Sequence, residues 1–318
     1  MDKMLTTSEV ADWLKERDNF LIITHRRPDG DTAGCAGALS QALREQGKTA
    51  YVLYNPEITP RYARYTEAYW ASDDYTPEHI IIVDTASLDL FPKNADKYKD
   101  NISLCIDHHS SNTLYADLVC LDGDRATCGE ILFDILMAMS GNISAISAES
   151  LYVAVSTDTG CFAFGNTTAN TLRVASLLIE AGAPHKKINK TLFRTKTRSR
   201  IELEGMLGIR LEYFFDGKVA IATITKEMIE KSGAVEDDLD DIAALPGAIE
   251  GVCIGITIRE LTSEYDCKIS VRSQSPYNSG EICSHFGGGG HKTAAGASSE
   301  KPVEEIKKEL LKVLHNHM

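Results

Sequence analysis

The sequence predicts an α/β protein with a parallel sheet and helices on both faces in its first part, then a helical linker, then a smaller α+β domain. Three observations support this. From Phe20 to about Ala181, short apolar runs alternate with helical patterns. A basic segment follows between Pro184 and Arg210, and longer β-rich runs begin at Leu211. The 318 residues suffice for two domains, each with its own core.

Apolar periodicity predicts each element of the first part in turn. Four apolar runs predict strands over 21–24, 49–54, 79–83 and 102–106. Helical spacing predicts helices over 32–46, 127–139, 148–156 and 168–181, after an amphipathic helix at 8–14. Gly47 is a C-terminal stop for the helix before it.

The second part has a different pattern. Strands are predicted over 219–224, 252–261 and 267–272, a further run over 293–297 and a terminal helix over 302–315. The domains are predicted over 1–187 and 211–318, with a basic helical linker over 188–210. The basic residues in and beside the linker are Lys186, Lys187, Lys190, Arg194, Lys196, Arg198, Arg200 and Arg210. A solvated helix face and an anion-facing one account equally well for these charges.

Bulk composition excludes several classes of protein. A hydrophobic content of 43% and a charged content of 25% are typical of soluble globular chains. The net charge of −13 argues against binding of long nucleic acids, which needs a broad basic surface. No apolar run approaches the ~20 residues of a membrane span, and no apolar signal core is present. Eight cysteines without a C-x-x-C pair indicate buried free thiols in a reducing compartment, so we expect a cytoplasmic protein that binds no membrane.

Acidic residues and histidines gather where three predicted strands end. His25, Asp29 and Asp31 follow the first strand, Asp84 follows the third, and Asp107-His108-His109 follow the fourth. In open parallel sheets these ends meet at one edge, where ligands bind. Imidazole and carboxylate without thiolate suit divalent ions such as Mn²⁺, Mg²⁺ or Zn²⁺.

Each of these carboxylates also has a simpler role open to it. Asp29 and Asp31 project the same way in an extended loop, so each can bind one of two neighbouring ions, and Gly30 permits the backbone twist. Alternatively, Asp31 caps the following helix. Asp84 is placed to be shared by two metals, although a strand-end Asp can also cap a turn.

The two histidines are assigned different roles. A metal-bound imidazole usually donates its other N–H to a carboxylate, so we expect Asp107 to orient His108 as the ligand and leave His109 for proton transfer. The converse assignment of the histidines stays open. Asp158 closes an apolar helix, where the helix dipole disfavours an unpaired carboxylate, so we assign it as a metal ligand.

These motifs, in their order along the chain, resemble those of the DHH phosphoesterase superfamily. The matching segments are His25-Arg26-Arg27-Pro28-Asp29-Gly30-Asp31, Val83-Asp84, Asp107-His108-His109 and Thr157-Asp158-Thr159-Gly160. The segment from Gly287 to Ala297, which contains Gly-Gly-Gly-Gly-His, resembles the signature of the DHH-associated C-terminal domain. The stretch from Gly160 to Thr168 most resembles the nanoRNase branch, whose members degrade very short oligonucleotides and dephosphorylate 3′-phosphoadenosine 5′-phosphate.

The resemblance implies two metal ions, with Mn²⁺ favoured. One would be held by His25, Asp29, Asp84 and Asp158, and the other by Asp31, Asp84 and His108, with Asp84 bridging. Cys35 stands where many relatives carry Ser, and we expect it to be a packing position without effect on the metals.

The resemblance also implies that the second domain holds the substrate. Gly288, Gly289 and Gly290 would offer backbone N–H groups to a phosphate, helped by His291 and Arg272. A flexible connector is the alternative role for the glycines. Arg194 and Arg198 are weaker candidates for the same anion.

The expected reaction is attack of a metal-activated water on a phosphoester, with His109 protonating the departing oxygen and Asp84 and Asp107 supporting the site. A substrate cleft between two domains favours short oligonucleotides and small nucleotides. The competing functions are a cyclic di-AMP phosphodiesterase and a non-catalytic nucleotide sensor. A homodimer is compatible with the sequence.

Overall fold

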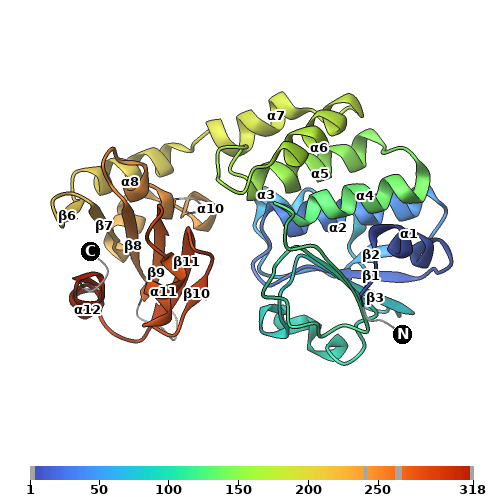
Figure 1. The fold of residues 1–318 in the computed structure, drawn as a ribbon, viewed down its shortest axis with the longest axis horizontal. Helices are drawn as coiled ribbons and strands as arrows, with labels where there is room; N and C mark the ends of the chain where they lie inside the picture. The colour runs from blue at the N-terminus through green and yellow to red at the C-terminus, as the bar shows by residue number, and fades with distance from the viewer. Residues whose placement is uncertain (1–3, 240–241, 262–266, 316–318) are drawn as a thin grey trace. The chain divides into compact units, whose positions relative to one another are not determined.

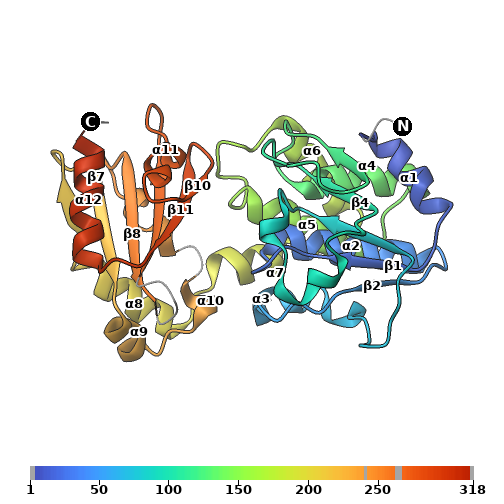
Figure 2. The same ribbon diagram turned by 90° about the horizontal axis from the view of Figure 1, so that it is seen from below.

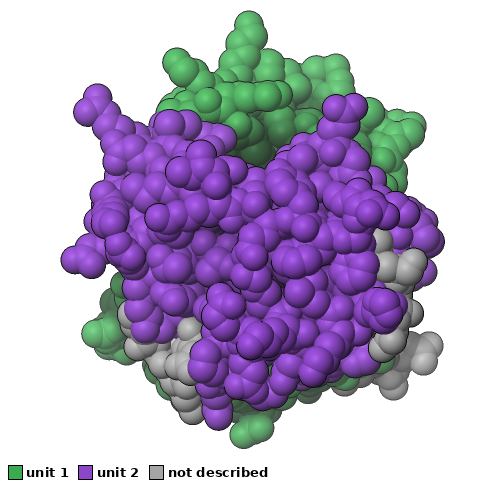
Figure 3. Space-filling view, turned by 90° about the vertical axis from the view of Figure 1, so that its left-hand side faces the viewer, with its two compact units in different colours: residues 1–195 green, residues 196–318 purple. Residues whose placement is uncertain are grey.

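The computed structural model describes residues 4–239, 242–261 and 267–315. The chain divides into two compact units, residues 1–195 and 196–318, each described by itself (Figure 3). No helix in these ranges is both long and apolar enough to cross a bilayer.

The first unit is built on a parallel sheet of five strands in the order β2-β1-β3-β4-β5 (Figures 1 and 2). The strands are β1 (Phe20–Ile23), β2 (Ala50–Val52), β3 (His79–Val83), β4 (Leu104–Asp107) and β5 (Leu118–Leu121). This order places a topological switch point between β1 and β3, where open α/β sheets bind ligands at the strand carboxyl ends.

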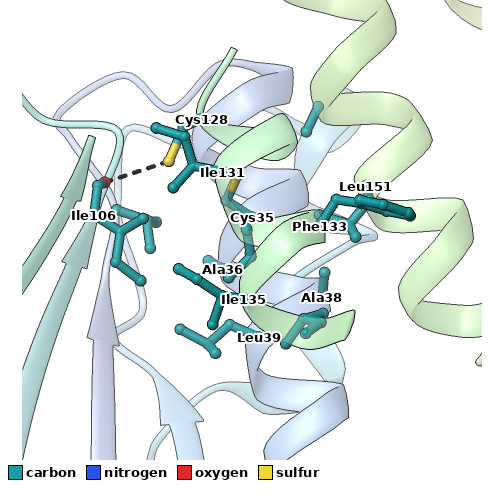
Figure 4. Packing of buried hydrophobic residues seen from close by; sticks show 14 of the residues in the cluster. Cys35, Ala36, Ala38, Leu39, Ile106, Cys128, Ile131, Phe133, Ile135 and Leu151 are labelled. Atoms are coloured by element: carbon teal, nitrogen blue, oxygen red, sulfur yellow. Dashed lines mark hydrogen bonds between the residues drawn. The ribbon is translucent and has the colours of Figure 1, made fainter. Parts of the chain in front are cut away.

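The α-helices of this unit share one large apolar cluster with one face of the sheet. They are α1 (Thr7–Lys15), α2 (Gly30–Glu45), α3 (Pro60–Ala63), α4 (Cys128–Ser140), α5 (Ala145–Asp158), α6 (Ala169–Glu180) and α7 (His185–Asn189). In Figure 4, Leu39 of α2 and Ile135 of α4 pack beside Ile106 of β4, and the Cys128 thiol donates to the Ile106 carbonyl.

The other face of the sheet is covered differently. Leu21, Ile80 and Cys105 pack there against Phe91 and Ala95. These last two lie in or beside short 3-10 helices, Leu88–Leu90 and Lys93–Tyr98. The predicted fold class is confirmed, but on this face the helices are 3-10 helices.

Helical structure continues beyond α7. A π-helical turn covers Lys190–Arg194, and α8 (Arg198–Gly208) begins the second unit. Glu204 pairs with Lys196 and Arg200, both at 2.7 Å, so part of the basic charge in this region is neutralised within the unit.

The second unit is a mixed sheet of six strands in the order β10-β11-β9-β8-β7-β6. The strands are β6 (Glu212–Phe214), β7 (Val219–Ile224), β8 (Ile254–Glu260), β9 (Cys267–Ser273), β10 (Gly289–Gly290) and β11 (Ala294–Ser299). Its other helices are α9 (Lys226–Ser232), α10 (Glu236–Leu239), α11 (Ser279–Ser284) and α12 (Val303–His315). Burial alternates along β9, and the apolar stripe of α12 (Ile306, Leu310, Leu314) packs on the same core.

Candidate metal centre

The loop after β1 is fixed by the first turn of α2. Asp29 Oδ1 accepts the N–H groups of Asp31 (3.0 Å) and Thr32 (3.2 Å), so Asp29 is the N-cap of α2. The alternative that Asp31 caps this helix is therefore wrong. Asp31 is buried, and its carboxylate accepts N–H groups from Cys128 (2.8 Å) and Gly129 (3.0 Å) at the start of α4.

Asp84 lies directly after β3 in a strained conformation. Its φ is 55°, the left-handed region that residues with a side chain rarely adopt. Its Oδ1 is buried and has no hydrogen-bond partner among the described residues. The nearest imidazole nitrogens are His108 Nε2 at 3.4 Å and His109 Nδ1 at 3.6 Å. A buried carboxylate oxygen left unsatisfied in this way is what a bound cation would complete.

The predicted ligands, together with His109, form three overlapping groups, and Asp84 belongs to two of them: His25, Asp29 and Asp84; Asp84, His108 and His109; and Asp31, His108 and Asp158. His25 Nε2 lies 3.7 Å from Asp29 Oδ1 and 3.8 Å from Asp84 Oδ2. In the group without Asp84, His108 Nε2 lies 3.9 Å from Asp31 Oδ2 and 3.6 Å from Asp158 Oδ2. Within each group the ligand atoms lie within 4.8 Å of one another.

These separations suit a cation better than direct hydrogen bonds. Two atoms each about 2.1 Å from one ion lie roughly 3.0–3.8 Å apart at angles of about 90–130°. The donor set of imidazole and carboxylate fits a divalent ion. The family resemblance implied that Asp158 shares an ion with His25 and Asp29, whereas in the structure its carboxylate groups with Asp31 and His108.

The residues of the Asp107-His108-His109 motif are connected differently from the expectation. Asp107 Oδ1 accepts a hydrogen bond from His109 Nδ1 at 2.7 Å, so Asp107 orients the His109 ring. Among the described residues, its only hydrogen bond to His108 is from the backbone N–H, at 2.8 Å, so the predicted contact with the His108 imidazole is wrong. His108 Nδ1 instead donates to the Arg125 carbonyl at 3.3 Å. The reason is that the loop before α4 brings this carbonyl to His108, which leaves His108 Nε2 facing the carboxylates.

Two supporting residues were missed by sequence reasoning. Asn112 Nδ2 donates to Asp107 Oδ2 at 2.6 Å and so completes the support of His109. Arg125 holds its loop through Asp122 at 3.0 Å and Asp134 at 2.7 Å. Asn112 lies only three residues after His109, and this proximity could have indicated that it supports the motif. Nothing in the sequence indicates that the Arg125 carbonyl contacts His108.

The cluster has the electrostatics of a cation site. Burial and the negative charges of Asp84 and Asp158 raise the pKa of Asp31 well above its usual value. Burial also raises the pKa of Asp158 to about 7, against the opposing charge of His108. Although burial disfavours a charged imidazole, the surrounding carboxylates raise the pKa of His25 to about 9 and that of His108 to about 11. Without a cation, Asp31 therefore retains its proton, Asp158 does so up to about pH 7, and the imidazoles of His25 and His108 are charged. Asp29 differs, because despite its burial the charge of His25 lowers its pKa to about 2.

The glycine run of the second unit is part of its sheet. Gly289 and Gly290 form β10 and pair with Gly296 and Ala295 of β11, so the alternative of a flexible connector is wrong. The Gly288 N–H already donates to the Cys283 carbonyl at 3.0 Å, so this amide is not available to a phosphate without breaking that bond.

The other predicted substrate-binding residues lie in both units. Arg272 lies on β9, opposite Ala294 of β11, and His291 lies in the turn that joins β10 to β11. Arg194 lies in the first unit, exposed at the end of the π-helical turn.

Cys35 is buried on α2, as expected of a packing position. Its thiol also donates to Asp31 Oδ1 at 3.3 Å. The position therefore contacts the metal cluster directly, contrary to the expectation that it only packs.

Known proteins share this organisation. The sequence model of the DHH family, N-terminal domain, matches residues 19–155, and that of the DHHA1 domain matches residues 216–318. The bifunctional oligoribonuclease and PAP phosphatase NrnA of Thermus thermophilus is 29% identical, covering 95% of this chain and 93% of its own length. An exopolyphosphatase-related protein of Bacteroides fragilis has the same fold, with a TM-score of 0.87 and 23% identity over 98% of this chain and 96% of its own. An exonuclease RecJ bound to manganese shares the fold at a TM-score of 0.54 and 14% identity, over 98% of this chain and 94% of its own.

The two family matches lie in the same order as the two units of the structure, and the predicted motifs fall at the strand ends where the ligand groups meet. The chain therefore belongs to the DHH family of phosphoesterases and carries a DHHA1 domain.

Proposed function

We propose that this protein hydrolyses short oligonucleotides to mononucleotides and removes the 3′-phosphate of 3′-phosphoadenosine 5′-phosphate, with two Mn²⁺ ions as cofactor. The observation that carries the proposal is the set of overlapping ligand groups at the switch point of the sheet, two of which contain Asp84. The relative at 29% identity, named for both activities and matched over nearly its full length, supports this substrate class. The manganese-bound exonuclease of the same fold supports the choice of metal.

The residues have separate tasks. His25, Asp29 and Asp84 would hold one ion, and Asp31, His108 and Asp158 the other. Asp84 Oδ1 lies 3.4 Å from His108 Nε2, so Asp84 would reach the second ion as well. When bound, such a pair lowers the pKa of a shared water and neutralises the phosphoryl oxygens.

Proton transfer falls to His109. Its Nδ1 hydrogen bond to Asp107 holds the ring and stabilises its protonated form, and the pKa of His109 is raised by that bond despite burial. His109 is thus suited to donate a proton to the departing oxygen. Arg272 and His291 of the second unit are proposed to hold the remainder of the substrate.

The test is a substrate panel with metal-stripped protein and added Mn²⁺. It compares a dinucleotide, a pentanucleotide, 3′-phosphoadenosine 5′-phosphate, cyclic di-AMP and pyrophosphate. We expect turnover of the dinucleotide and of 3′-phosphoadenosine 5′-phosphate. Preferential turnover of cyclic di-AMP would assign the protein as a cyclic dinucleotide phosphodiesterase, and activity confined to pyrophosphate would remove the nuclease function. Nucleotide binding without any turnover would identify a sensor.

Removal of the Asp84 carboxylate tests the proposed metal site by mutation. Asp84→Ala and Asp84→Asn should abolish turnover and weaken Mn²⁺ binding measured by titration calorimetry, because Asp84 belongs to two ligand groups. Circular dichroism should show a folded chain, since the substitution removes a carboxylate that the other acids repel. Asp12→Asn, at an exposed position of α1, is the control and should leave both measurements unchanged. Retained activity in Asp84→Ala would contradict the shared role.

A further inference from the structure

The turn that follows Asp158 has an unusual backbone. Gly160, Cys161 and Phe162 have φ values of 56°, 56° and 67°, so three successive residues adopt the left-handed conformation. Two of them carry side chains, for which this conformation costs of the order of 1 kcal/mol or more each. Such strain persists only where surrounding contacts fix the backbone.

Hydrogen bonds fix this turn against α5. The Cys161 N–H donates to the Ser156 carbonyl at 2.7 Å, and the Phe164 N–H donates to the Thr159 carbonyl at 3.0 Å. Asn166 Nδ2 donates to the Asp158 carbonyl at 3.1 Å. The turn is therefore held to the helix end that presents the Asp158 carboxylate.

The turn directs its two phenylalanines in different ways. Phe162 packs against the core, with its ring 6.0 Å from that of Tyr152 in a T-shaped contact. Phe164 is 57% exposed. Its ring lies against the backbone of Gly160, so closely that a Cβ on Gly160 would stand 2.4 Å from the ring.

This exposed ring belongs to the turn that directly follows Asp158, a member of the metal cluster. Gly160 is two residues from Asp158, so their Cα atoms are at most about 7.6 Å apart. Arg194, at the end of the π-helical turn Lys190–Arg194, is near enough to this turn for its positive charge to lower the pKa of the Cys161 thiol, against the larger raising effect of burial. A flat apolar surface, a cation and a phosphoester site within one unit suit a ligand that is both aromatic and anionic.

We propose that Phe164 is a stacking platform for a nucleobase of the substrate whose phosphate lies at the metal cluster. This inference rests on the proposed function, because it names how the same site recognises a nucleotide rather than any phosphoester. Base–aromatic stacking tolerates every base, so Phe164 would select for the presence of a base and not for its identity. Arg194 would add attraction for the phosphates.

The test compares a substrate with its base-free counterpart. Wild-type protein and Phe164→Ala are assayed with Mn²⁺ on 3′-phosphoadenosine 5′-phosphate and on the corresponding ribose bisphosphate that lacks adenine. We expect Phe164→Ala to lower kcat/KM for the adenine-bearing substrate about tenfold, mainly through KM, as the loss of one base stack predicts. Turnover of the base-free substrate should not change. Phe164→Leu should behave like Phe164→Ala, and Phe164→Trp should restore the wild-type value.

Ile146→Ala is the matched control. Ile146 is 55% exposed and lies at the start of α5, whereas Phe164 follows the end of this helix. Truncation of Ile146 therefore removes exposed apolar surface far from Phe164. The kcat/KM of neither substrate should change in Ile146→Ala. A kcat/KM that falls equally for both substrates in Phe164→Ala would show that the ring only supports Asp158, and an unchanged kcat/KM would show that it does not touch the base; either result overturns the proposal.

A binding measurement separates this proposal from the proposed function. Titration of Phe164→Trp with 3′-phosphoadenosine 5′-phosphate should quench tryptophan fluorescence beyond the change seen in wild-type protein. If wild-type protein turns over no nucleotide, the proposed function fails, and the presence or absence of this quenching still decides whether the ring stacks on a base.

Discussion

Three imidazoles and a set of carboxylates, crowded at one edge of a sheet, make the protonation of this protein depend on whether a cation is present. The raised pKa values of Asp31 and Asp158 mean that the folded chain binds more protons than the unfolded chain between about pH 4 and 7. The raised pKa of His25, about 9, extends this difference to higher pH. The stability of the metal-free chain should therefore fall as pH rises through this whole range.

Mn²⁺ should reverse that trend. Its ligands must be deprotonated, so binding displaces protons and strengthens as pH rises. We expect the increase in Tm caused by saturating Mn²⁺ to be small at pH 6 and several-fold larger at pH 8.5, measured by calorimetry against protein in EDTA. Asp158→Asn should flatten the pH dependence of the metal-free Tm between pH 6 and 8. An equal Tm increase at both pH values would show that protons and the metal do not compete at this cluster.

The sequence was sufficient to predict which residues form the cluster, but not which hydrogen bonds they make. The gathering of five of the six predicted ligands could be predicted because they follow strands, and parallel strands end at one edge of a sheet. Asp158 instead ends helix α5 and was assigned from the helix dipole. The partner of Asp107 could not, because it depends on side-chain torsion angles and on a loop that brings the Arg125 carbonyl to His108. Backbone carbonyls are present at every residue, so a sequence carries no signal for which one is used.

Among the elements, the packing of α2 against α5 determines how closely the ligands meet. The two helices run antiparallel, with Gly30 of α2 against Thr157 of α5, and Gly34 against Ser150 and Ala154. Small residues let the backbones approach, and this approach brings the start of α2, with Asp31, to the end of α5, with Asp158.

Gly34→Ala tests this role. A Cβ at Gly34 would lie 2.4 Å from the Ser150 carbonyl oxygen, so the helices must separate. We expect a loss of about 1–3 kcal/mol in the free energy of unfolding and weaker Mn²⁺ binding, since Asp31 and Asp158 move apart. Chemical denaturation and titration calorimetry measure the two effects.

Gly205→Ala is the control for helix propensity. Gly205 is exposed on α8 with nothing within 4 Å of its Cβ position, so alanine there should leave stability unchanged or raise it by up to about 1 kcal/mol. A Gly34→Ala chain with wild-type stability and metal affinity would mean that the close approach of α2 and α5 does not set the ligand geometry.

Several elements were predicted well from the apolar pattern of the sequence. The range predicted for β7 agrees with the structure, and α4 differs by one residue at each end. Strand β5 and the 3-10 helices on the second sheet face were not predicted. The 3-10 helices, of three and six residues, carry too few positions for a helical period to emerge, and tertiary packing decides their conformation.

For the whole molecule, the division into two units separates metal binding from the rest of the chain. The first unit has apolar clusters on both faces of its sheet, and the second unit has its own clusters around Ile256 and Leu203. All of the residues in the ligand groups belong to the first unit.

The acidic net charge of −13 is consistent with small anionic substrates that are held locally and not with long nucleic-acid strands held by a broad basic surface.

Hydrogen exchange should show this separation directly. A ligand that binds only the folded form of one unit stabilises that unit against opening by RT ln(1 + [L]/Kd). We expect saturating Mn²⁺ to slow amide exchange at the start of α2, the start of α4 and the end of α5, and to leave β8 and β9 unchanged. Asp84→Asn should lose most of this protection. Equal protection of both units would show that metal binding is coupled to the DHHA1 domain, and that the cluster is then a sensor for the whole chain as well as a catalytic centre.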